Sequence, residues 1–242
     1  MPYGYGYGYY YGFSPVILAL FIASLVLSLY ASTKVNSNFR KYSNVYSKTG
    51  LTGMQVARRI LDSNGLYNVR VEMCRGRLSD HFDPRRNIIR LSSDVYNSHS
   101  IAAISVAAHE CGHAIQYQQG YAMLKFRNTI AVPVNIANNL SWIFIILGLA
   151  VGGAAEVSGS YMLMDIGILL FAFVVLFHLV TLPVELNASK RAIAQMEDLG
   201  LVFTEEKVCA RKMLSAAALT YLAALAAAVV QLLRLLALRG RD

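Results

Sequence analysis

Charged residues are scarce in this sequence. Asp, Glu, Lys and Arg make up 15% of the 242 residues, whereas a soluble domain of this size usually carries about a quarter. Hydrophobic residues make up 56%, and the mean hydropathy is +0.44. The excess of apolar residues is concentrated in long runs, so the composition argues against a soluble domain and predicts a membrane protein.

Cysteine is also scarce. The three cysteines (Cys74, Cys111 and Cys209) are widely spaced and form no C-x-x-C pair. Their number and spacing exclude a disulfide framework and are compatible with a reducing compartment. Cys111 has a small, apolar side chain that we expect to be packed inside the protein.

The basic residues surround hydrophobic segments and form no nucleic-acid-binding motif, although the formal net charge is +8. Basic residues that flank apolar runs are typical of membrane proteins, in which they favour the cytoplasmic side. We therefore expect the lipid bilayer as a partner and no nucleic acid.

Four apolar runs are long enough to be candidate membrane helices. The first has no Lys or Arg before it and no small-residue cleavage site after it, which favours a retained helix over a cleaved signal peptide. The fourth either spans the membrane or packs as a hairpin within it. The runs cover residues 15–31, 133–153, 161–182 and 213–233.

These runs predict a mostly helical membrane protein of about four transmembrane helices, and the polar stretch between the first two runs predicts a small α+β unit. The expected segments are a flexible Tyr/Gly-rich N-terminus (1–13), the first membrane helix (14–33), the α+β unit (34–132), a membrane hairpin (133–182), a polar helical segment that begins after a break at Pro183 (183–212), and the last apolar helix with its basic tail (213–242).

The α+β unit contains the motif H-E-x-x-H at residues 109–113, which predicts that the unit is zincin-like and catalytic. On a helix, His109 and His113 leave the same face one turn apart, which is the spacing that two ligands of one zinc ion need. Glu110 projects beside the metal, where it can take a proton from a water molecule that the metal activates. The surrounding helix is apolar, and a buried carboxylate is costly unless it is paired or near a metal.

The residues before the motif predict a helix and two strands. Residues 51–61 form an amphipathic pattern with Thr52 as N-cap. Residues 69–73 and 87–92 are the strand candidates. In zincin-type peptidases a strand beside the metal helix pairs with the extended substrate; we expect this to be residues 87–92, with Ile89 and Leu91 as contacts. Asp80 and His81 precede this strand and either contact substrate or stabilise the turn.

A catalytic zinc usually has three protein ligands, so a third must come from elsewhere. The second and third apolar runs form a hairpin that returns the chain to the side of the metal helix, and Glu185 is among the first polar residues after that return. Its alternative role is an ordinary ion pair with Lys190 or Arg191.

Basic residues are abundant in both segments on that side and absent from the turn of the hairpin, which places the metal helix on the cytoplasmic side. The arginines at the C-terminus then lie outside, against the rule.

Three blocks make the sequence resemble the YugP-type neutral zinc metallopeptidases of bacterial and archaeal membranes: residues 78–84 together with 88–92, residues 106–116, and residues 182–192. The resemblance implies a membrane zinc endopeptidase with His109, His113 and Glu185 as ligands and Glu110 as general base. More distantly, the chain is similar to HtpX-like and CAAX prenyl proteases. In those relatives an Asp follows the Glu ligand by four residues and supports a zinc-binding His; here that position is Ser189.

The predicted function is therefore zinc-dependent hydrolysis of peptides or proteins, membrane proteins among them, at the cytoplasmic face of the cell membrane. Two alternatives are a non-catalytic scaffold with a structural metal site and a zinc transporter. The intact Glu110 argues against the first, because a structural zinc does not need it. The scarcity of polar residues within the first and third apolar runs argues against the second.

Overall fold

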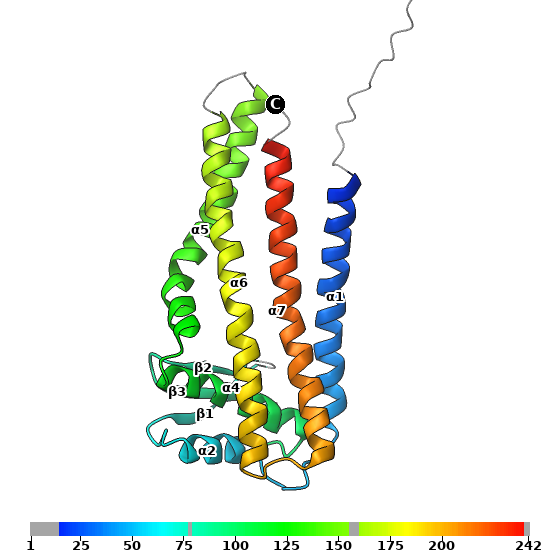
Figure 1. Cartoon of the computed structure of the whole chain (residues 1–242), viewed down its shortest axis with the longest axis vertical. Helices are drawn as coiled ribbons and strands as arrows, with labels where there is room; N and C mark the ends of the chain where they lie inside the picture. The colour runs from blue at the N-terminus through cyan, green and yellow to red at the C-terminus, as the bar shows by residue number, and fades with distance from the viewer. Residues whose placement is uncertain (1–14, 77–78, 155–159, 240–242) are drawn as a thin grey trace, which may run out of the picture.

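The computed structural model describes residues 15–76, 79–154 and 160–239. Four long helices run side by side, and a small α+β unit lies at one end of them (Figure 1). Each of these helices is long and apolar enough to cross a membrane, including the fourth, for which the sequence left a hairpin open. This confirms the predicted mostly helical membrane fold. The predicted flexible N-terminus, residues 1–13, lies outside the described residues. The long helices are α1 (Pro15–Ser43), α5 (Ala122–Ala154), α6 (Ser160–Asp198) and α7 (Thr204–Arg239).

The α+β unit lies between α1 and α5 in the chain. Its elements are α2 (Gly53–Ser63), β1 (Arg70–Cys74), β2 (His81–Asp83), β3 (Ile88–Ser92), α3 (Ser93–Tyr96) and α4 (Ile101–Gln118). Thr52 caps α2 as predicted, because its hydroxyl accepts from the Gln55 backbone while the Gln55 side chain accepts from the Thr52 backbone. This reciprocal capping satisfies backbone groups that the first helical turn would leave open.

The three strands form a sheet in the order β1-β3-β2, with β1 parallel and β2 antiparallel to β3. Both predicted strands are present, but β2 was missed because three residues are too short to show an alternating pattern. The predicted substrate-binding role of β3 is wrong. It is the central strand, and its Ile89 and Leu91 side chains are 0% exposed. The nearly continuous apolar run of β3 is typical of a strand that is buried on both faces.

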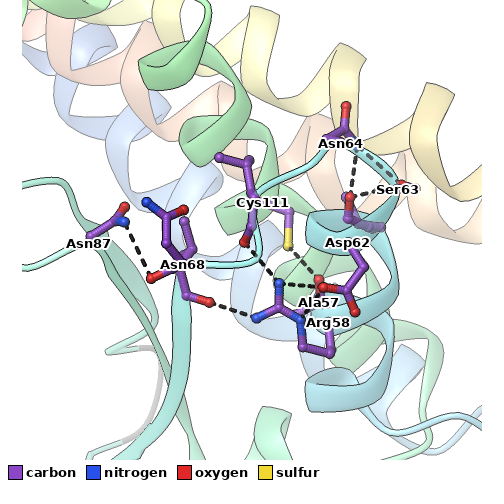
Figure 2. A network of polar contacts seen from close by, with 11 residues as sticks. Ala57, Arg58, Asp62, Ser63, Asn64, Asn68, Asn87 and Cys111 are labelled. Atoms are coloured by element: carbon purple, nitrogen blue, oxygen red, sulfur yellow. Dashed lines mark hydrogen bonds and ion pairs between the residues drawn. The ribbon is translucent and has the colours of Figure 1, made fainter.

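The helix α4 is the centre of the α+β unit, and most of its residues are buried. On the side toward α2, the Cys111 thiol lies 3.5 Å from the Ala57 carbonyl oxygen (Figure 2). Next to it, the guanidinium of Arg58 donates to Asp62 and to the backbone carbonyls of Leu66 and Val69. This network joins the end of α2 to the start of β1, so that α2 forms a fixed support behind the metal-motif helix.

On its other side α4 crosses α6 in close contact. A Cβ atom on Gly112 would lie 2.5 Å from the carbonyl oxygen of Ala188, so only glycine fits there. The predicted break at Pro183 is wrong, because α6 continues through this residue. A proline removes only one backbone donor from a helix, and within membrane proteins neighbouring groups compensate for that loss. The uninterrupted α6 carries the residues after the hairpin directly onto α4.

Candidate metal centre

The crossing of α4 and α6 brings His109, His113 and Glu185 together. The Glu185 Oε2 atom lies 3.3 Å from His109 Nε2 and 3.4 Å from His113 Nε2. One ligand atom from each residue lies within 4.8 Å of those of the other two. The Gly112–Ala188 contact lies between the two histidines on one helix and beside Glu185 on the other, so the close approach of the backbones sets these distances. No ion pair joins Glu185 to Lys190 or Arg191 in the described residues.

This donor set fits a zinc ion. Two imidazoles and one carboxylate are a known set for catalytic zinc. With bonds of roughly 2.0–2.1 Å, two ligand atoms at the corners of a tetrahedron lie about 3.3–3.4 Å apart. The two distances to Glu185 agree with that edge length. The side chain of Glu185 is 3% exposed, and a carboxylate buried to this degree needs a cation or donors beside it.

The hydrogen bonds around His113 leave its Nε2 atom free to bind a metal. Arg191 can only donate, and its Nε donates to Asn187 Oδ1. Gln116 faces the same oxygen and the Val184 carbonyl, so its amide nitrogen donates to both. The Gln116 oxygen then accepts from His113 Nδ1, 3.0 Å away. Since Nδ1 carries the proton in the neutral ring, Nε2 keeps its lone pair.

His109 has a different outer partner. Its Nδ1 atom lies 3.2 Å from the hydroxyl oxygen of Ser189, one turn after Glu185 on the same face of α6. Ser189 therefore contacts the histidine from the position, four residues after Glu185, that the sequence analysis singled out. In the described residues no carboxylate contacts His109 Nδ1. A neutral hydroxyl still fixes the orientation of the ring, but adds no negative charge to it.

We expect Gln116→Leu to weaken zinc binding by roughly 10–100-fold, the usual cost of losing an outer partner of a metal-binding His. The leucine fills the space but leaves His113 Nδ1 without its acceptor. Zinc affinity measured by competition with a chelating dye checks this, with Gln118→Leu on the exposed part of α4 as control. Equal affinities of the two variants would show that the amide does not orient His113.

Glu110 lies beside the three candidate ligands in the same cleft. Burial raises its pKa to about 7, while the neighbouring His109 and a hydrogen bond from the backbone of Phe82 oppose that rise. Phe82 belongs to β2, so this strand also orients the carboxylate.

The cleft around these residues has a volume of about 170 Å³. Asp80 and His81 both line it. Asp80 accepts from the backbone and hydroxyl of Ser92, so it ties β2 to the end of β3. Burial raises the pKa of Asp80, and the bonds from Ser92 oppose that rise. His81 is exposed, and its Nδ1 atom lies 2.8 Å from the Ser79 carbonyl oxygen.

Two further polar residues of the cleft had no signal in the sequence. Arg127 comes from α5, and its Nη2 atom lies 3.8 Å from Glu185 Oε1. Tyr221 comes from α7 and lines both this cleft and a smaller cavity of about 150 Å³ that Glu110 also lines. Neither residue belongs to a local motif; only the packing of α5 and α7 against α4 brings them to the site.

A family model described as "Putative neutral zinc metallopeptidase" matches residues 17–240. The chain belongs to this family. It is also 47% identical, over 229 residues, to a Bacillus subtilis (strain 168) protein described as "Putative membrane protease YugP". That match covers 94% of this chain and 99% of the relative. No solved structure matches the chain.

The match to the neutral zinc metallopeptidase family extends over all ten helices and strands of the described chain apart from the first two residues of α1. The four apolar helices therefore belong to the shared architecture, as does the α+β unit. This extent agrees with a site that needs both parts, since His109 and His113 come from the α+β unit and Glu185 from a membrane helix.

Proposed function

We propose that the protein is a membrane zinc endopeptidase that hydrolyses peptide bonds at the cytoplasmic face. The observation that carries this proposal is the convergence of His109, His113 and Glu185 in a cleft that also holds Glu110. A structural metal site would not require Glu110. Family membership supports both the zinc ion and the protease activity.

The three converging residues would hold the zinc ion, with Nε2 of each histidine and a carboxylate oxygen of Glu185 as donors. Zinc held by such a set would polarise a substrate carbonyl and would lower the pKa of a bound water molecule toward neutrality. Ser189 and Gln116 keep the two imidazoles in the required orientation. Arg127 lies next to Glu185 and offsets part of its negative charge.

Glu110 acts as the general base. Its carboxylate accepts the proton of the attacking water, and the same carboxyl group then returns that proton to the nitrogen of the leaving amine. The backbone of Phe82 lies close enough to interact with this carboxylate and would help to orient it in the cleft. Proton uptake and release by one side chain is the role to which a pKa near neutrality is suited.

The strand β2 is the element on which an extended substrate would lie. It forms one edge of the sheet, whereas β3 is paired on both sides. Its residues His81 and Phe82 line the cleft together with His109 and Glu110. An edge strand can add a peptide as a further strand through main-chain hydrogen bonds, which would place the scissile bond beside the metal.

The distribution of charge supports a cytoplasmic site. The α+β unit and the adjoining ends of α6 and α7 carry most of the basic residues, and such residues favour the cytoplasm. At the far end, Arg239 forms an ion pair with Asp165, with 2.8 Å between Nε and Oδ1.

Removal of the metal tests the function directly. Purified full-length protein in detergent should cleave an unfolded protein substrate, lose that activity when dialysed against a zinc chelator, and regain it when zinc is added. Magnesium should not restore it, because the nitrogen donors of the site favour zinc. Full activity in the metal-free protein would overturn the proposal.

A further inference from the structure

A basic hollow lies between α1 and α7, outside the candidate metal centre. Four cationic side chains line it: Lys34, Lys41, Arg211 and Lys212. The hollow has a volume of about 690 Å³, and Val208, Ala216 and Leu219 give it an apolar part. In the described chain, none of the four cations forms an ion pair, and no carboxylate lines the hollow.

The hollow lies where the two helices leave the membrane. Lys34 follows the apolar run of α1, and Lys212 directly precedes the apolar run of α7. The two helices lie side by side, and their basic segments are at the same end as the α+β unit (Figure 1). The Asn38 amide donates to the Lys212 carbonyl oxygen at 2.9 Å, which fixes the register of the two helices at this level.

The arrangement combines positive charge at the interface with apolar surface on the membrane side. Four like charges around one hollow repel each other, and a bound anion removes that repulsion. Toward the membrane, Leu219 is followed one turn later on α7 by Leu222, whose side chain is 45% exposed. A ligand with a phosphate at one end and hydrocarbon at the other matches both parts.

We propose that this hollow binds the phosphate headgroup of an anionic phospholipid in the leaflet on the side of the metal centre. Basic pockets between membrane helices are suited to such headgroups. The acyl chains lie against the apolar faces of α1 and α7. The site does not require the proposed hydrolase activity, so either proposal can fail without the other.

Spin-labelled phospholipids provide the test. The full-length protein is reconstituted in phosphatidylcholine membranes with a trace of labelled phosphatidylglycerol or labelled phosphatidylcholine, and the motionally restricted fraction is measured. We expect at least about a fivefold preference for phosphatidylglycerol, the effect of one or more cations at a lipid phosphate. The fourfold variant Lys34→Gln/Lys41→Gln/Arg211→Gln/Lys212→Gln should lose that preference.

The control removes the same number of charges within the α+β unit, through Arg59→Gln/Arg75→Gln/Arg85→Gln/Arg90→Gln, and should keep the preference. If the fourfold hollow variant does not fold, the single variants Lys34→Gln and Lys212→Gln should each lower the preference. An equal preference in hollow and control variants would overturn the proposal. Binding of inorganic phosphate to the hollow in detergent, with no preference between the labelled lipids, would also overturn it, because a free anion would then be the ligand.

Discussion

Glu110→Gln should reduce peptide hydrolysis by roughly 10²–10⁴-fold, the usual contribution of a general acid–base residue. Glutamine has the same shape as glutamate, so its amide oxygen can still accept from the Phe82 backbone. It cannot take a proton from water at neutral pH. Because Glu110 is not among the candidate metal ligands, the zinc content of the purified variant should equal that of the unmodified protein.

The matched control is Glu72→Gln, the same chemical change on β1 at a distance from the cleft. It should leave hydrolysis and zinc content unaltered. The decisive measurement is turnover per bound zinc, since this separates loss of the base from loss of the metal. Retained turnover in a zinc-loaded Glu110→Gln protein would exclude this carboxylate as the base.

Glu185→Ala should abolish both hydrolysis and stoichiometric zinc binding. Structural zinc sites with four ligands bind with about 10–16 kcal/mol, so each ligand contributes on the order of 3 kcal/mol, or about a hundredfold in affinity. The alanine also leaves His109 and His113 without the carboxylate that lies 3.3–3.4 Å from their Nε2 atoms. Metal analysis after gel filtration measures the loss.

Asp198→Ala is the control for this variant, because it removes an exposed carboxylate near the end of the same helix. It should retain zinc and activity. The variant His113→Ala should behave like Glu185→Ala, since both remove one donor of the same set. If Glu185→Ala bound zinc as tightly as the control, the third ligand would have to be a different residue.

The sequence predicted the parts of this molecule that depend on local pattern. The apolar runs predicted the long helices, Thr52 predicted the start of α2, and the spacing of His109 and His113 predicted a common face of α4. Glu185 required a topological argument as well, because the hairpin α5–α6 had to return the chain to α4. The structure brings these three side chains together.

The remaining parts depend on contacts between distant segments. β3 lies at the centre of the sheet because β2 pairs with its second edge. β2 has too few residues to show an alternating apolar pattern in the sequence. Tyr221 reaches the cleft only because α7 packs against α4 and α6. Likewise, the role of Gln116 depends on the amide oxygen of Asn187 on another helix, which accepts from both Gln116 and Arg191. No spacing rule along the chain could have identified these residues.

The division of the centre between α4 and α6 has a consequence for biosynthesis. Glu185 lies 76 positions after His109, beyond a complete membrane hairpin. A ribosome-bound chain therefore displays the H-E-x-x-H segment well before the third donor has been made. The full set assembles only after α5 and α6 have entered the bilayer and turned back. Under the proposed function, the chain would be inactive while it is being made and would acquire activity only once it is in the membrane.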